Sequence, residues 1–163
     1  ARQHPVRARP LLDDLATLLL EDPQYSVVWK AATALAALAG EYPQDLADAI
    51  AQDAAAVTVL LADPDPDVRR IGSGLLSYVC EYHPVAADPV LDDLRDRLCD
   101  DDPGVRTNAV RALEDAGGTD ALDSLTQLVE EDPDPDVREI SAAAVQTIQR
   151  RREDTTDVGG ENA

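Results

Sequence analysis

The sequence predicts an all-α protein, an α-α superhelix of about four stacked helix pairs. Four Asp-Pro dipeptides, beginning at residues 22, 65, 102 and 134, each precede an apolar run with helical spacing. A valine follows each dipeptide, and successive valines are 41, 37 and 32 residues apart. Residues 4–20 and 83–99 also match without a gap at ten of seventeen positions. Repetition at periods of about 20–50 residues is typical of proteins built from stacked supersecondary units.

The first helix pair is expected over residues 10–40. Its first helix, near 11–21, carries a stripe of leucines, and its second, near 24–39, follows Asp22-Pro23. An N-cap Asp accepts a hydrogen bond from an unpaired backbone N–H, and Pro fits the first helical position because it has no N–H to leave unpaired. This copy, DPQYSVVW, is the least regular, since it has two extra residues and no Arg after Val27.

The other three pairs are expected over residues 43–82, 84–116 and 119–152. Apolar residues at helical spacing predict first helices near 43–62, 89–100 and 119–131 and second helices near 66–82, 103–116 and 135–152. Within these ranges the apolar side chains lie on one face, as in a packed amphipathic helix. Residues that recur in register are expected to serve the repeat itself: the N-cap aspartates Asp22, Asp65, Asp102 and Asp134, and Arg69, Arg106 and Arg138.

The three recurring arginines are expected to pair with aspartates of adjacent turns, with ligand contact as the alternative. Each directly follows the valine that begins the apolar stripe of a second helix.

The motifs DPDPDVRRIGSGLLSYV, DDPGVRTNAVRAL and DPDPDVREISAAAVQTI resemble the second helices of HEAT repeats, including the variant named for phycobilisome lyases. The resemblance covers residues 10–150 and implies a right-handed stack, with first helices outside and second helices lining a concave surface. A single solenoid over residues 1–152 is therefore expected. The polar residues 153–163 lack periodicity and are expected to form a disordered tail.

The chain is strongly acidic, with a formal charge of -19, and Lys30 is its one lysine. Self-repulsion at this charge destabilises a compact state in dilute buffer, whereas molar salt shortens the screening length to roughly 3 Å. This composition is similar to that of acidic HEAT-repeat proteins of extreme halophiles. The alternative is an acidic protein with a basic partner. A basic footprint for nucleic acid is missing from the sequence, so no nucleic-acid partner is expected.

No catalytic residues, metal ligands or cofactor are expected, and the chain is predicted not to be an enzyme. The paired carboxylates Asp13-Asp14 and Asp92-Asp93 fall on exposed helix faces. Cys80 and His83 have CxxH spacing, but two ligands do not complete a zinc site. The sequence has no long apolar run and no signal-like start, which favours a cytoplasmic protein with no membrane contact. A monomer is expected.

The candidate site is the outward face of the second helices, where residues differ between repeats. Trp and Arg are favoured anchors of protein interfaces. We therefore expect a protein or peptide to bind at Trp29, Thr33, Arg70, Ser77 and Arg111. For Trp29, the alternative is that its ring fills a gap left by the irregular first repeat.

The leading functional hypothesis is a non-catalytic scaffold for protein–protein interaction. The runner-up is an accessory or maturation factor of the lyase-like HEAT type, which holds a cofactor-bearing protein substrate. Several convergent aromatic or histidine side chains in a concave pocket would favour this second hypothesis. The identity of the partner does not follow from the sequence.

Overall fold

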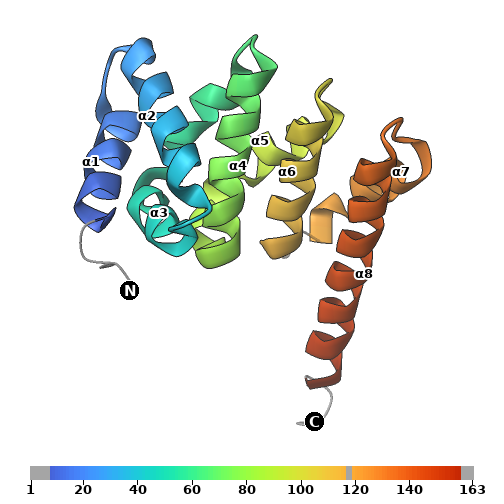
Figure 1. Cartoon of the computed structure of the whole chain (residues 1–163). Coiled ribbons are helices and arrows are strands. Elements are labelled where there is room, and N and C mark those ends of the chain that lie inside the picture. Colours follow the sequence, from blue (N-terminus) through green and yellow to red (C-terminus); the bar gives the residue numbers. More distant parts are fainter. Residues whose placement is uncertain (1–7, 117–118, 159–163) are drawn as a thin grey trace, which may run out of the picture.

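The computed structural model describes residues 8–116 and 119–158, and in this part of the chain every regular element is helical. The helices form four antiparallel pairs that follow one another along the array (Figure 1). The predicted all-α solenoid is confirmed. In chain order the elements are α1 (Ala8–Glu21), α2 (Tyr25–Ala39), α3 (Pro43–Ile50), η2 (Ala51–Ala62), α4 (Pro66–Tyr82), η3 (Pro84–Val90), α5 (Leu91–Asp96), η4 (Arg97–Cys99), α6 (Pro103–Asp115), η5 (Thr119–Ala121), α7 (Leu122–Glu131) and α8 (Pro135–Val158).

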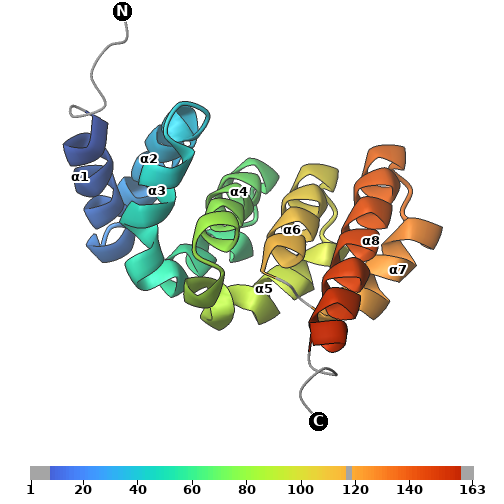
Figure 2. The same ribbon diagram turned by 90° about the horizontal axis from the view of Figure 1, so that it is seen from below.

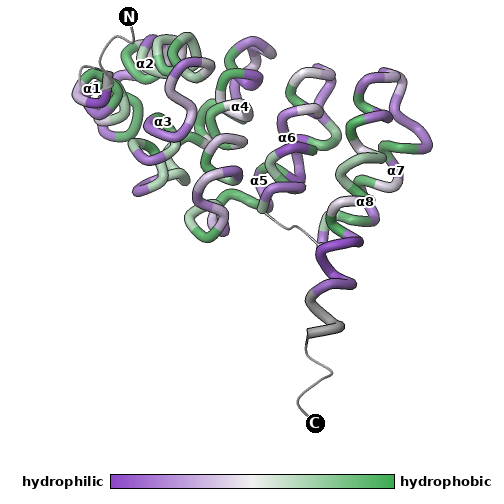
Figure 3. Tube along the Cα trace, turned by 60° about the horizontal axis from the view of Figure 1, so that its bottom comes forward, coloured by the Kyte–Doolittle hydropathy of each residue, from purple (hydrophilic) through white to green (hydrophobic). Residues whose placement is uncertain are grey.

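The pairs stack into two layers. The second helices α2, α4, α6 and α8 form one layer, and the first helices and their 3₁₀ continuations form the other (Figure 2). The array curves gently, with the second helices on its inner side. Hydrophobic and hydrophilic stretches alternate along each helix (Figure 3), because each helix buries one stripe between the layers. The largest fully buried side chains are leucines and one isoleucine: Leu12, Leu19, Leu35, Leu46, Ile50, Leu60, Leu75, Leu76, Leu94, Leu98, Leu113 and Leu125.

Aspartate caps three of the four second helices. Asp65 and Asp102 are the N-cap residues of α4 and α6, and their carboxylates accept from the backbone N–H of Asp67 at 2.9 Å and of Val105 at 3.0 Å. Asp134 accepts in the same way from the N–H of Asp136 at 2.9 Å, at the start of α8. Each cap satisfies a donor that the first helical turn leaves unpaired.

The predicted cap of the first repeat is wrong. The N-cap of α2 is Gln24, whose side chain makes no capping bond, and Asp22 lies two residues earlier. The carboxylate of Asp22 accepts from the N–H of Gln24 at 2.8 Å. The carboxylate of Asp63 makes the same bond to the N–H of Asp65, at 2.7 Å. Asp22 therefore corresponds to the loop aspartate of the later repeats, and Gln24 stands at the N-cap position of Asp65. In this alignment residues 22–29 match residues 63–70 without a gap, so the two extra residues inferred from the sequence are not present.

The first helices of the second and third repeats are less regular than predicted. The helix expected near 43–62 leaves helical geometry at Asp53, where φ is -148° and ψ is 59°. Asp competes with the helix by bonding to nearby backbone groups, so it favours such breaks. The helix expected near 89–100 is preceded by the 3₁₀ segment η3, which contains Pro89. Proline lacks an N–H and restricts the residue before it, so the α-helix begins only at Leu91.

The last helix is longer than predicted. The tail is expected from residue 153, but α8 continues to Val158. Arg150 to Glu153 are good helix formers, so a helix already formed over the preceding turns extends across them at little cost. Residues 159–163 of the predicted tail lie outside the described residues. No helix in the described part of the chain has the length and hydropathy needed to cross a membrane.

Candidate functional site

Two recurring arginines join consecutive repeats. The guanidinium of Arg69 donates through Nε and Nη2 to both carboxylate oxygens of Asp100, each at 2.8 Å. Arg106 binds Asp132 of the fourth repeat with the same two distances. The remaining nitrogen, Nη1, donates to backbone carbonyls of the arginine's own loop, for example from Arg106 to Asp100 at 2.7 Å. We call this arrangement the inter-repeat clasp; it gives Arg69 and Arg106 a structural role.

The clasp sets the protonation of its carboxylates. Burial is the largest influence on Asp132 and opposes its ionisation. The hydrogen bonds from Arg106 and from the N–H of Asp134, together with the charges of Arg106 and Arg138, outweigh burial, so the pKa of Asp132 lies below its usual value. The pKa of Asp100 is lowered by the same balance, with Arg69 as the donor. Both carboxylates are therefore charged at neutral pH, and each is held by a charged donor from the preceding repeat.

The first repeat uses a tyrosine in place of the arginine. Val28 follows the first repeat valine, and the hydroxyl of Tyr25 donates to the carboxylate of Asp63 instead. Burial and this hydrogen bond raise the pKa of Tyr25 to about 12. The same bond, reinforced by the backbone N–H of Asp65, lowers the pKa of Asp63. The first and second repeats are thus joined at the same loop position by different chemistry.

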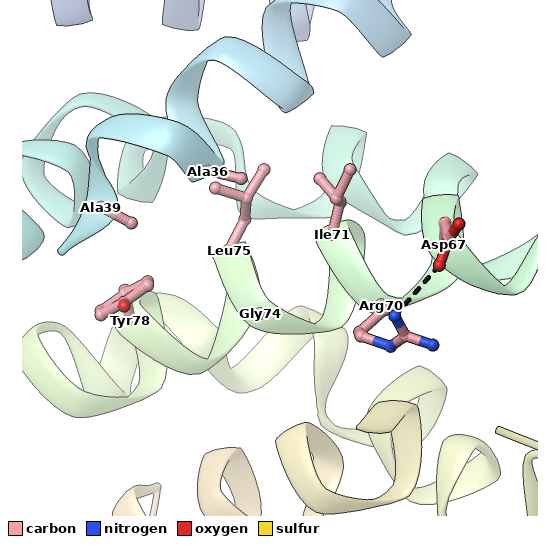
Figure 4. A pocket seen from close by; sticks show the side chains of 8 residues that line it. All are labelled: Ala36, Ala39, Asp67, Arg70, Ile71, Gly74, Leu75 and Tyr78. Carbon is pink, nitrogen blue, oxygen red and sulfur yellow. Dashed lines mark hydrogen bonds and ion pairs between the residues drawn. The ribbon is translucent and has the colours of Figure 1, made fainter. Parts of the chain in front are cut away.

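A groove of about 410 Å³ lies between α2 and α4 on the inner layer (Figure 4). Ile71 and Leu75 point from α4 towards α2, opposite Ala36, and form an apolar floor. Tyr78 lies towards one end, while Asp67 and Arg70 lie at the other, near the start of α4. The full lining is Ala36, Ala39, Asp67, Arg70, Ile71, Gly74, Leu75 and Tyr78.

Arg70 is the one predicted binding residue that lines this groove. Its Nε and Nη2 bond the carboxylate of Asp102 at 3.1 and 2.5 Å, and its Nη1 donates to Asp67 at 3.0 Å. The side chain of Asp67 is 76% exposed and that of Arg70 47% exposed. The predicted contact residue is therefore already paired within the chain and links α4 to the cap of α6.

The other four predicted residues lie on the inner layer but do not line the groove. The side chain of Trp29 is 40% exposed, and the hydroxyl of Thr33 donates to its carbonyl at 2.9 Å. Ser77 is half-buried and donates to the carbonyl of Gly74 at 2.8 Å, while Arg111 is exposed on α6. Trp29 is seven residues before Ala36, so the two share a face of α2 about 10 Å apart along the helix.

Sequence reasoning missed Ile71, Leu75 and Tyr78 as groove residues. They lie three, seven and ten positions after Val68, next to the helix face that the prediction used. The helical stripe predicts Ile71 and Leu75 as core residues, and Leu75 is buried. They also line a groove, because α2 presents Ala36 and Ala39 opposite them, and small side chains leave the space between the helices unfilled. The alanines in this part of α2 are the signal that could have located the groove.

An acidic cluster lies where α4 and α6 end. Burial raises the pKa of the Asp115 carboxyl above its usual value, and the neighbouring Glu114 and Glu81 add to the effect. Arg151 and Arg111 lower it in part. Arg151 also donates from Nη1 to the carbonyl of Glu114 at 2.6 Å. This end of the inner layer is therefore a region of unfavourable negative charge.

We expect Asp115→Asn to raise the free energy of unfolding at pH 7. A raised folded pKa means that the stability of the wild type is full below the unfolded pKa and is lost as pH rises through the folded value. Asn removes this loss, so the gain at pH 7 should vanish at pH 3. Urea unfolding midpoints of wild type and variant, measured in molar salt at pH 7 and pH 3, give this gain. Asp14→Asn, exposed on α1, controls for the change in net charge; an equal gain in that variant would contradict the assignment.

The two cysteines are both free thiols. Cys80 is buried, and burial raises its pKa to about 12, so its thiol stays protonated. Cys99 is exposed beside a cavity of about 380 Å³ between the third and fourth repeats. Among the described residues, no group of three or more histidine, cysteine, aspartate or glutamate side chains is arranged to hold a metal ion.

Solved structures with a similar fold are repeat proteins. An engineered protein has a TM-score of 0.68 and 22% identity, over 85% of this chain and 62% of its own length. A designed armadillo repeat protein in complex with the peptide (KR)4 has a TM-score of 0.65 and 21% identity, over 85% and 64%. The complex of CpcE and CpcF of phycocyanin lyase from Nostoc sp. PCC7120 has a TM-score of 0.50 and 21% identity, over 85% and 98%.

The chain thus spans less than two thirds of the length of these engineered and designed proteins. A comparison with curated proteins gives no match. Structural likeness at this identity shows the fold alone, whereas the family models show which family the chain belongs to. The model for HEAT repeats matches residues 54–146, which is more than half of the chain, and a model for a HEAT-like repeat matches residues 25–79. The chain belongs to the HEAT repeat family.

Proposed function

We propose that this chain is a non-catalytic scaffold that binds a segment of a partner protein along its inner layer, with an apolar side chain of that segment in the α2–α4 groove. The observation that carries the proposal is the groove itself, which is open and floored by Ile71, Leu75 and Ala36. An apolar pocket with a few polar groups at its edge is the usual form of a recognition site. Trp29, exposed on the same face of α2, supplies a large anchor beside it.

Charge favours a partner segment with basic residues next to the apolar one. Asp67 is exposed at one end of the groove, and the whole chain carries a formal charge of -19. Unlike charges across an interface speed encounter and fix the register of the partner. The designed armadillo neighbour holds a peptide of alternating basic residues, which supports a similar mode here. Among the groove residues Tyr78 is the one aromatic side chain, so no observation favours the lyase-like accessory role.

Peptides selected from a displayed library in molar salt test the proposal. Selected peptides should contain an apolar side chain beside a basic one and should shift the fluorescence of Trp29, the single tryptophan. Ala36→Glu places a charge in the groove and should weaken binding by about tenfold or more, which corresponds to 1.4 kcal/mol. Ala55→Glu makes the same change at an exposed position of the outer layer and should leave affinity unchanged. Equal affinity for both variants would place the binding site elsewhere.

A further inference from the structure

The last repeat presents half of an inter-repeat clasp. Nη1 of Arg138 donates to the carbonyls of Asp132 at 2.7 Å and Pro133 at 3.2 Å. Nη1 of Arg106 makes the same two bonds in its own loop, at 2.7 and 3.2 Å. These bonds orient both guanidinium groups in the same way. The other two donors of Arg106, Nε and Nη2, bind the carboxylate of Asp132 in the next repeat. Among the described residues, no carboxylate accepts from Nε or Nη2 of Arg138.

The first repeat presents the other half. Asp22 occupies the loop position of the clasp aspartates, and its carboxylate accepts from the N–H of Gln24 at 2.8 Å. Asp132 makes the equivalent bond to the N–H of Asp134 at 2.9 Å. Asp132 also accepts from the arginine of the preceding repeat, but within the described part of the chain no side chain donates to Asp22. The α8 end therefore presents a donor, Arg138, and the α1 end presents an acceptor, Asp22, each at its position in the repeat.

The helices that carry the half-clasps also expose apolar side chains. Leu113 and Val110 of the third repeat are fully buried, but their counterparts in α8, Val145 and Ala142, are only half-buried. At the opposite end Leu11 is 50% exposed, although Val90, which it matches in the internal repeat, is fully buried. Leu18, seven residues later on the same face of α1, is 40% exposed. Each end face thus has the apolar surface that the inner repeats cover with a neighbour.

We propose that the α8 end of one copy binds the α1 end of a second copy, head to tail, with Arg138 clasping Asp22 of the adjoining copy. A second copy is the partner that fits, because the charge and the repeat position of Arg138 at one end match those of Asp22 at the other. A head-to-tail contact does not close on itself after one step, so short open chains should form. Repulsion between two copies of charge -19 opposes the contact in dilute buffer, and molar salt screens that repulsion more than it screens the desolvated clasp. Association should therefore increase with salt, in contrast to the monomer that the sequence predicts.

Sedimentation velocity over a range of protein concentrations, in dilute and in molar salt, tests this association. Arg138→Glu and Asp22→Arg should each raise the concentration for half-association by about tenfold or more. The two substitutions in one chain restore opposite charges across the contact and should recover most of the association. Arg150→Glu changes the charge equally at an exposed position of the same helix and should have no effect. Circular dichroism of each variant verifies that it is folded.

Three outcomes would overturn the proposal: a chain that stays monomeric in molar salt at every concentration, association that neither single variant weakens, or a double variant that fails to recover it. The measurement needs no partner protein. Its result is therefore independent of whether the α2–α4 groove binds a peptide.

Discussion

Replacing Arg106 with alanine is expected to lower the free energy of unfolding by about 3 to 5 kcal/mol, the usual cost of removing one partner of a buried ion pair. The side chains of Arg106 and Asp132 are 8% and 2% exposed. Without the guanidinium, the Asp132 carboxylate stays buried with no charged donor, and the carbonyls of Asp100 and Asp101 lose the Nη1 donor. Urea unfolding in molar salt, followed by circular dichroism, measures the loss.

The same loss should depend on pH. The lowered pKa of Asp132 means that its pair stabilises the wild type above the usual carboxyl pKa, and this stabilisation is lost as pH falls through the folded value. In the Arg106→Ala protein only the N–H of Asp134 and the charge of Arg138 oppose burial, so the pKa of Asp132 should rise and protonation should relieve the buried charge. The difference between wild type and variant should therefore shrink towards pH 3.

Two further variants separate the clasp from simple loss of packing. Asp132→Asn keeps an oxygen for the N–H of Asp134 but removes the charge, so it should recover part of the stability lost in Arg106→Ala and destabilise the wild type. Arg69→Ala should cost less, about 1 to 3 kcal/mol, because Arg97 remains 3.4 Å from the Asp100 carboxylate. Equal losses for Arg69→Ala and Arg106→Ala, or no recovery with Asp132→Asn, would contradict this account.

Most of the fold could be predicted because the repeat has a local cause at each step. An Asp-Pro cap, a valine and a stripe at helical spacing specify a second helix without reference to the rest of the chain. Only the arginine half of the inter-repeat clasp could be predicted from the sequence. The recurring arginines predict a structural role, but their partners lie 31 and 26 residues away, at Asp100 and Asp132, and only stacking brings them together.

The candidate site was harder to predict because it depends on the spacing between helices. Outward offsets correctly identify exposed positions such as Trp29 and Arg111, but a groove forms where two helices fail to fill the space between them. That property depends on pairs of residues, here Ala36 and Leu75, rather than on either position alone. The pairing of Arg70 could likewise not be predicted from its neighbours in the sequence, because its partner Asp102 belongs to the next repeat. The salt-adapted character of the acidic surface stays a prediction, as does the identity of any partner.

Two glycines on α4 should respond in opposite directions to alanine. A Cβ on Gly72 would lie 2.7 Å from Cβ of Leu60, with Cδ2 of Leu61 and the Leu60 carbonyl carbon both at 3.4 Å. Because Leu60 Cβ is fixed to the backbone, α4 must move away from η2, and the buried contacts between them loosen. Overpacking of this kind costs about 1–3 kcal/mol or more, beyond the gain of about 1 kcal/mol for replacing a helical glycine. We expect Gly72→Ala to be clearly destabilising.

Gly74→Ala should be stabilising by up to about 1 kcal/mol, since its Cβ would meet only the Asn108 amide nitrogen at 3.4 Å, an ordinary contact. Both variants remove one glycine from the same helix, so backbone entropy cancels and their difference in urea midpoint reports the α4–η2 spacing. The third and fourth repeats carry Ala109 and Ser141 at the register of Gly72, so a Cβ is compatible with the motif in general. A stabilised Gly72→Ala protein would mean that the second repeat accommodates a Cβ at this register as those two do, and that its close helix contact is not required for stability.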